Sequence, residues 1–121
     1  MSWNFESGIS LSQQIVSRIR AEIIGGKYAP GDQFPTVRHL AYEASVNPNT
    51  VQKALTALEV EGLLVARGTV GRFVTNDIEV IEKARSTVRT EYMRHVLEEA
   101  HKLGIDDQAF IDFIKESEGM K

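Results

Sequence analysis

Apolar positions recur at helical spacing near the start of the chain. Ser10 begins a Ser-x-x-Gln capping pattern, and the apolar residues that follow it lie four residues apart: Ile15, Ile19 and Ile23. The pattern stops at Gly25-Gly26, a pair that favours the end of a helix. We therefore expect a first helix that supports a core.

The stretch 36–55 predicts two further helices joined by a tight turn. Thr36 is a preferred N-cap for the first of these helices. Asn47 is a preferred N-cap for the second, and Pro48 suits the first helical position because the missing N–H of proline is no loss there. The second helix is therefore expected to start at Pro48 and to run to about Glu61.

The helix that starts at Pro48 has two contrasting faces. Apolar residues fall on one face and polar residues on the other: Val51, Leu55 and Leu58 against Asn49, Gln52, Lys53 and Thr56. Amide, hydroxyl and ammonium groups on the first turns suit the base edges and phosphates of a DNA major groove. Glu59 and Glu61 lie at the far end, where they repel phosphate, so we expect the N-terminal half to face DNA.

Residues 63–67 and 72–75 predict the two strands of a hairpin around the loop 68–71. Three helices followed by a hairpin make a winged helix-turn-helix. One interpretation is that the hairpin only closes the core, through Leu64, Phe73 and Val74. The other adds contacts between this wing and the DNA backbone or minor groove, through Arg67, Gly68, Thr69 and Arg72.

A long tail helix is predicted over residues 78–103, between a polar hinge at Asn76-Asp77 and Gly104, and a second helix follows Asp106. These two helices lack the mass for an independent core, so their apolar faces need a cover. The simplest cover is a second copy of the chain, which gives a two-fold homodimer; packing back on the winged helix of the same chain is the alternative. The residues expected in the dimer interface are Ile81, Val88, Tyr92, Val96, Leu103, Phe110, Phe113 and Ile114.

The predicted fold is therefore α+β and mostly α. A winged helix-turn-helix DNA-binding domain is expected over residues 1–76, and a two-helix dimerisation tail over residues 77–121. The length of 121 residues and the hydrophobic content of 42% allow one core of ordinary size plus an appendage of this kind.

Charge limits how DNA binding is achieved. The 14 basic and 17 acidic residues give a net charge of −3, the wrong sign for a generic polyanion binder. Residues 1–77 hold seven of each kind, so the acidic excess lies in the tail and DNA binding must depend on a few placed cations.

Arg38 sits in the first turn of its helix, where a cation opposes the helix dipole. It is either an incidental surface residue or a contact to phosphate or guanine, which we favour; Arg18 and Arg20 are interpreted as solvated surface charges.

Several classes of function are disfavoured. The sequence has no cysteine, hence no disulfide and no thiolate metal site. It has neither a signal peptide nor an apolar run of about 18 residues, so we expect a cytoplasmic protein without a membrane partner. His39, His95 and His101 make no metal-ligand pattern, and no nucleophile, base and acid stand together by spacing. We therefore expect no metal, no cofactor and no enzymatic activity.

Short motifs are spread over residues 11–74: Gln14-Ile15, Gly26, Pro30-Gly31-Asp32, Phe34-Pro35-Thr36-Val37-Arg38, Leu40-Ala41, Val46-Asn47-Pro48-Asn49-Thr50-Val51, Ala54, Leu58-Glu59, Glu61-Gly62-Leu63 and Gly71 with Phe73-Val74. Together they resemble the DNA-binding domain of GntR-family bacterial transcription regulators, and the short helical tail is similar to that of the YtrA-like subfamily. The resemblance implies a homodimer on a pseudo-palindromic operator, often repressing its own operon, commonly beside transporter genes. The YtrA-like subfamily lacks the large effector-binding domain of the other subfamilies, so an effector is left open: it would bind the dimer interface or does not exist. The DNA-facing positions that it indicates are Arg38, Asn47, Asn49, Thr50, Gln52 and Lys53, with Gly68 and Thr69 at the wing.

Three positions depart from the family pattern. His39 stands where the family usually has Glu, so the capping box of the second helix is lost. Ser45 stands where the turn commonly has Gly, which is tolerable if the local backbone avoids positive φ. The wing also has fewer arginines than is typical, which weakens its expected phosphate contact.

The alternative function is a winged-helix module that binds protein and not DNA. It would account for the acidic net charge and for the weak wing. The uncharged polar groups of Asn49, Gln52 and Thr56 argue against it, because a protein-binding face more often carries exposed aromatic residues or leucines.

Overall fold

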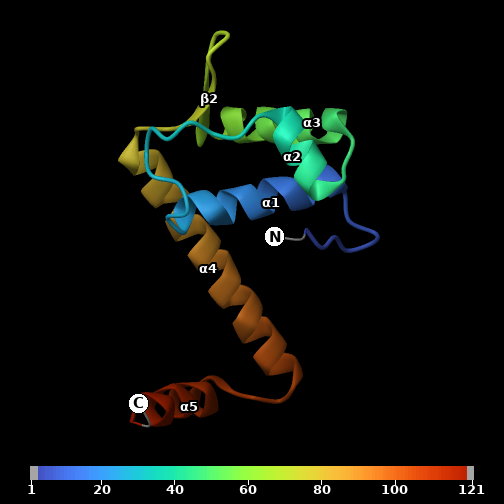
Figure 1. The fold of residues 1–121 in the computed structure, drawn as a ribbon. Coiled ribbons are helices and arrows are strands. Elements are labelled where there is room, and N and C mark those ends of the chain that lie inside the picture. Colours follow the sequence, from blue (N-terminus) through green and yellow to red (C-terminus); the bar gives the residue numbers. More distant parts are fainter. Residues whose placement is uncertain (1–2, 120–121) are drawn as a thin grey trace. The chain divides into compact units, whose positions relative to one another are not determined.

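The computed structural model describes residues 3–119, a mostly helical chain with one small antiparallel sheet (Figure 1). The elements in order are α1 (Leu11–Ile24), α2 (Val37–Ala44), α3 (Pro48–Val60), β1 (Leu64–Arg67), β2 (Gly71–Val74), α4 (Ile78–Lys102) and α5 (Asp107–Gly119). The predicted fold class, a winged helix-turn-helix followed by two C-terminal helices, is confirmed. The chain divides into two compact units after Arg85.

The N-terminal caps form as the sequence predicts. Ser10 Oγ accepts a hydrogen bond from the Gln13 amide at 3.4 Å at the start of α1. At α2, Thr36 Oγ1 accepts from the His39 amide at 3.1 Å, so half of a capping box survives without Glu at position 39. Asn47 Oδ1 accepts from the Asn49 amide at 2.8 Å and opens α3.

The turn between α2 and α3 does not avoid positive φ, the condition under which serine is tolerable at position 45. Ser45 has φ 55° and ψ 47°, the left-handed conformation, and caps the C-terminus of α2 with its amide directed at Ala41 and Tyr42 oxygens. The next amide, of Val46, donates to Ala41 O at 3.1 Å, which completes a Schellman-type ending. The backbone therefore does enter positive φ here, and a serine bears a strain that glycine would not.

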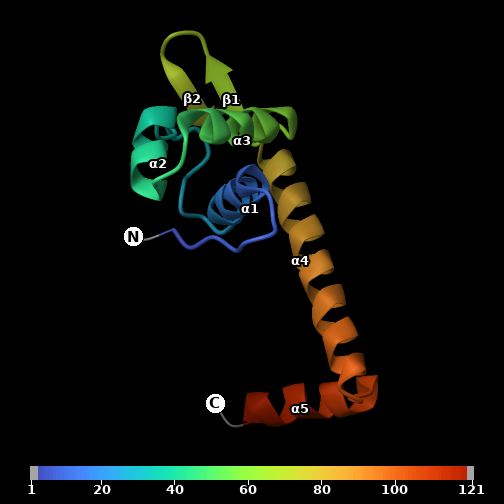
Figure 2. The same ribbon diagram turned by 90° about the vertical axis from the view of Figure 1, so that its right-hand side faces the viewer.

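The core of the first unit lies between the helices and the base of the hairpin. Figures 1 and 2 show α1, α2 and α3 packed together, with the hairpin projecting beyond α3. Leu64 and Val74 close this core as predicted, but Phe73 is only half-buried. The buried cluster consists of Ile15, Ile19, Ile23, Phe34, Leu40, Ala41, Val51, Ala54, Leu55, Leu58, Leu63, Leu64, Val74 and Ile81.

The hairpin has a three-residue loop, 68–70, between strands paired from Leu64 with Val74 to Arg67 with Gly71. The segment before α2 lies along β2, where Gln33 forms an isolated antiparallel bridge with Phe73. This segment adds a short strand-like edge to the hairpin, which two strands alone would leave weakly supported.

The first turns of α4 belong to the winged-helix unit. Ile81 is 5% exposed and lies in the core cluster, and Arg85 Nε donates to Ile24 O at 2.9 Å. Ile81 was expected in a dimer interface, but its apolar surface is already covered within this chain, and we leave it out of that surface. The border between the DNA-binding domain and the dimerisation tail, expected after residue 76, stays a prediction. The division into two compact units lies later, after Arg85.

The second unit comprises the rest of α4 and α5. α5 starts directly after Asp106, as predicted, and Asp106 Oδ1 accepts a hydrogen bond from the Ala109 amide at 2.8 Å. His101 Nε2 and Asp107 Oδ1 lie 2.6 Å apart across the turn. Apolar residues of both helices line a groove of about 560 Å³: Tyr92, Met93, Val96, Leu97, Phe110, Ile111 and Ile114. Among residues 3–119, no helix has the length and apolar character needed to cross a membrane.

Candidate nucleic-acid interface

The outward face of α3 carries the polar side chains that the sequence predicted. Asn49, Gln52, Lys53 and Thr56 are exposed, whereas Val51, Leu55 and Leu58 are at most 1% exposed. Gln52 Nε2 donates to Thr56 Oγ1 at 3.4 Å, a long bond on an exposed surface that DNA base edges can replace. The helix therefore offers a continuous hydrogen-bonding face on a rigid support.

Two further predicted residues flank this face at the start of α3. Asn47 is exposed, and its Oδ1 is engaged in the N-cap, which leaves the amide nitrogen as the group that can meet DNA. Thr50 is half-buried in the first turn. Both lie at the N-terminal end of α3, where the positive end of the helix dipole favours phosphate.

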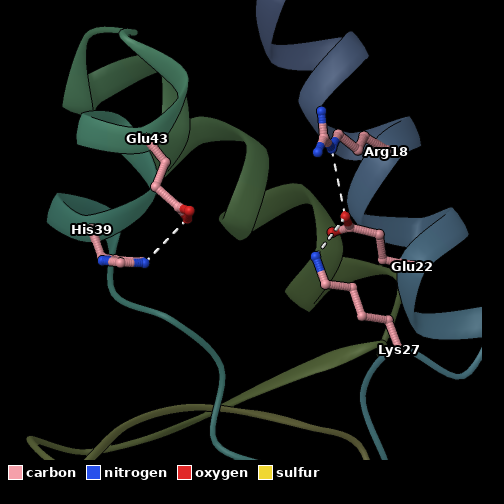
Figure 3. Close-up of polar contacts among 5 residues, drawn as sticks. All are labelled: Arg18, Glu22, Lys27, His39 and Glu43. Atoms are coloured by element: carbon pink, nitrogen blue, oxygen red, sulfur yellow. Dashed lines mark hydrogen bonds and ion pairs between the residues drawn. The ribbon is translucent and has the colours of Figure 1, made fainter. Parts of the chain in front are cut away.

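Ion pairs engage most of the cations of the first unit. Figure 3 shows Arg18 and Lys27 both directed at Glu22, at 3.5 Å and 3.0 Å. The Arg18 guanidinium also lies 3.8 Å from the centre of the Trp3 ring. Arg20 pairs with Glu61 through two hydrogen bonds of 2.9 Å and 2.7 Å. Arg18 and Arg20 are therefore surface charges that pair with groups of the protein itself.

The two wing arginines are also engaged. Arg72, on β2, forms an ion pair with Glu59 of α3, and its side chain is 19% exposed. The Arg67 guanidinium lies 4.7 Å from the centre of the Phe73 ring and stays exposed. Glu59 and Glu61, expected to repel phosphate, each face an arginine, which reduces that repulsion. Arg72 is thereby held on the protein, while Arg67 keeps an accessible charge.

Arg38 and Lys53 differ from these cations. Both are exposed, and neither forms an ion pair with any of residues 3–119. On α2 the carboxylate of Glu43 lies 3.1 Å from His39 Nε2, as Figure 3 shows, and forms no ion pair with Arg38. The structure therefore leaves two cations of the helix-turn-helix available for a polyanion.

The loop of the wing is exposed and small. Gly68 has φ 54° and Thr69 is exposed beside it, so backbone and hydroxyl groups can approach a surface closely. Sequence reasoning missed Gln33, whose Nε2 donates to Val70 O in this loop at 3.0 Å. It also missed the pairing of Glu59 with Arg72, because partners 13 residues apart in different elements leave no periodic signal.

One titratable group outside this face has a shifted pKa. Burial raises the pKa of the Tyr28 hydroxyl, whose ring packs 5.1 Å from that of Phe34. The phenol therefore stays protonated at neutral pH and belongs to the support of the fold.

Comparison with known proteins gives a consistent family. The model of the family "Bacterial regulatory proteins, gntR family" matches residues 11–74. The uncharacterized HTH-type transcriptional regulator YhcF of Bacillus subtilis is 26% identical over 115 residues, which are 95% of each chain. The HTH-type transcriptional repressor YtrA of the same organism is 29% identical over 111 residues, 91% of this chain and 85% of that protein.

Solved structures agree with these relatives. A GntR family transcriptional regulator from Listeria monocytogenes has a TM-score of 0.85 and 31% identity, covering 93% of this chain and 98% of its own. The DNA-binding domain of AraR in complex with operator ORX1 has a TM-score of 0.55 and 28% identity, covering 62% of this chain and 95% of its own. The chain belongs to the GntR family of bacterial regulatory proteins, and it is a YtrA-like transcriptional regulator with a winged-helix DNA-binding domain, not an enzyme.

Proposed function

We propose that this protein is a cytoplasmic, sequence-specific repressor that binds a pseudo-palindromic operator as a homodimer. The observation that carries the proposal is the pairing of an uncharged hydrogen-bonding face on α3 with two accessible cations, Arg38 and Lys53. Unpaired cations at a polar helix face serve phosphate binding, and the amides beside them serve base recognition.

In this proposal the first turns of α3 enter the major groove. Asn49 and Gln52 contact base edges, because amides form two hydrogen bonds with adenine. Arg38 and Lys53 bind phosphates on either side, supported by Asn47 and Thr50 at the start of α3. The accessible cations are few, so affinity depends on each of them more than in a strongly basic protein.

The wing adds a second contact with DNA through Gly68 and Thr69. Arg67 supplies the positive charge of this contact. Arg72 is assigned a structural role, because its guanidinium pairs with Glu59. The wing contact is therefore weaker than one made by several free arginines, and it is expected to meet the backbone or the minor groove.

The homodimer is proposed to form through the second unit. Four of the expected interface residues expose large apolar surface, namely Tyr92, Leu103, Phe113 and Ile114, and three are half-buried, namely Val88, Val96 and Phe110. Exposed apolar area of this extent on the two tail helices favours burial against a second copy. Two copies present two recognition helices, which explains an operator with two-fold symmetry.

Repression is proposed from the similarity to the repressor YtrA. A dimer bound at a promoter excludes RNA polymerase without needing an additional domain. The resemblance to the YtrA-like subfamily further leads us to propose that the repressed operon is the protein's own and lies beside transporter genes.

The deciding experiment is selection of bound sites from random duplexes with the full chain, followed by a salt titration on the most enriched duplex. We expect an inverted repeat whose half-sites lie about one or two helical turns apart. The slope of log K against log salt should be about −0.9Z, with Z about 4–8 per dimer. No enrichment, or binding without salt dependence, would exclude the DNA proposal and favour a protein-binding module.

A further inference from the structure

The tip of the wing has little support of its own. Gly68, Thr69 and Val70 are exposed, and the turn is closed by a hydrogen bond from the Val70 amide to Arg67 O at 3.0 Å. Strands of four residues in a two-stranded ribbon are marginal in water. The orientation of the tip therefore depends on what the neighbouring segment contributes.

The segment before α2 fixes the base of the wing through its backbone. The Phe34 amide donates to Arg72 O at 2.8 Å, and the Val74 amide donates to Asp32 O at 2.8 Å. Between these bonds Gln33 forms the isolated bridge with Phe73. Figure 2 shows the loop of the wing extending beyond the ends of β1 and β2.

The side chain of Gln33 extends this support to the tip. Its Nε2 donates to Val70 O at 3.0 Å, which joins the segment before α2 to the loop of the wing. Gly71, next to Val70, has φ 121°, a backbone conformation that favours glycine, and a Cβ built there would lie in van der Waals contact with Gln33 Nε2, at 3.4 Å.

Packing does not replace this hydrogen bond. A hollow of about 270 Å³ lies between the wing and the start of α2, lined among others by Gln33, Thr36, Val37, Gly68 and Val70. A tip that stands over a hollow has few apolar contacts to hold it. A directional hydrogen bond across the hollow therefore has a large effect on where the tip points.

We propose that Gln33 is a positioning residue for DNA recognition: its amide holds the wing tip at the orientation in which Gly68 and Thr69 meet DNA. This inference rests on the proposed function, since it assumes a DNA contact at the wing. Gln33 itself need not touch DNA. Its effect on binding passes through Val70 and the loop.

The first test uses the free protein and needs no DNA. Gln33→Met keeps the length of the side chain and removes the donor. We expect lower heteronuclear NOE values for the amides of Gly68, Thr69 and Val70, with the thermal midpoint unchanged because Gln33 is exposed. Gln108→Met is the matched control, since Gln108 donates to Asp112 at 2.9 Å within α5. Loop amides as rigid as in the wild type would overturn the proposal.

The second test measures binding to the duplex most enriched by the wild type. Gln33→Met should weaken binding roughly three- to tenfold for each protomer, the loss expected when one hydrogen bond of modest net worth is removed. Thr69→Asp, which places a carboxylate at the wing tip, should weaken binding by itself. In the Thr69→Asp background Gln33→Met should add less than twofold, because the contact that it positions is already lost.

The outcomes separate the two proposals. If the wild type binds DNA but the two substitutions are fully additive, or either one has no effect, the role of Gln33 is overturned. The proposed function then stays intact. A wild type that enriches no duplex would overturn the proposed function and, with it, the role of Gln33 in recognition.

Discussion

Ser45 bears a conformation that its side chain disfavours. Its φ of 55° lies in the left-handed region, where a Cβ costs roughly 1–2 kcal/mol. Ser45→Gly should therefore raise the free energy of unfolding by about 0.5–1 kcal/mol, after the larger loss of chain entropy for glycine. Urea unfolding of the full chain measures this change. Ser45→Ala, which keeps the Cβ, is the control, and equal stability of the glycine and alanine variants would contradict the prediction.

Arg38 and Lys53 are the residues whose removal should most affect DNA affinity. If the proposed contacts form, Arg38→Ala or Lys53→Ala removes one phosphate contact from each protomer, and the salt slope should become less steep by about 2 per dimer. Anisotropy titrations of a selected duplex at several salt concentrations give this slope. Lys27→Ala serves as the control, because Lys27 lies 3.0 Å from Glu22 and is already paired. A control that reduces the slope as much would point to general charge and not to placed contacts.

At the scale of elements, Glu59 limits what the wing can contribute. The ion pair with Glu59 holds Arg72 against α3. Glu59→Gln keeps the shape of the side chain and removes its charge, which leaves Arg72 available for phosphate. Operator affinity should rise, and the salt slope should steepen by up to about 2 per dimer. Glu118→Gln makes the same change of net charge in α5, and an equal gain from that control would show a bulk charge effect.

Local rules predicted the helices and strands because their signals lie close together in the sequence. Ser10, Thr36, Asn47 and Asp106 cap helices within a few residues of themselves, and the apolar spacing of α1 and α3 identifies their buried faces. The strand pairing followed from a glycine-bearing loop between apolar runs. The position of the exposed polar face of α3 could therefore be predicted from the sequence, while its role in recognition stays a prediction.

Contacts between distant segments were not readable in this way. Gln33 reaches Val70 across 37 residues, and Arg20 reaches Glu61 across 41. Which arginines are paired decides which cations stay available, and that depends on how α1, α3 and the wing pack together. Ile81 shows the same limit, because its helical stripe is equally consistent with a dimer interface and with the core that buries it.

At the scale of the whole molecule, the burial of Ile81 sets where the chain can be divided. A fragment ending at Arg85 keeps Ile81 in the core and retains the bond from Arg85 to Ile24 O. A fragment ending at Asp77 loses both, at a cost of about 2–5 kcal/mol for the apolar side chain alone. We expect the longer fragment to unfold cooperatively and the shorter one to be markedly less stable in thermal unfolding followed by circular dichroism. Equal stability of the two fragments would place Ile81 outside the core.

The same division tests the dimer. The fragment ending at Arg85 should sediment as a monomer and bind the selected duplex far more weakly than the full chain, because a single recognition helix loses the gain from linked half-sites.

A full-length point variant tests the proposed dimer surface directly. Phe113 is 68% exposed, and Phe113→Glu should shift the chain towards monomer with its helical content unchanged, whereas Lys115→Glu on the same helix should not. A fragment that stays dimeric would move the interface onto the winged helix. In that case the exposed apolar residues of α4 and α5 would need a different partner, and the symmetry of the operator would be set by the DNA-binding domains themselves.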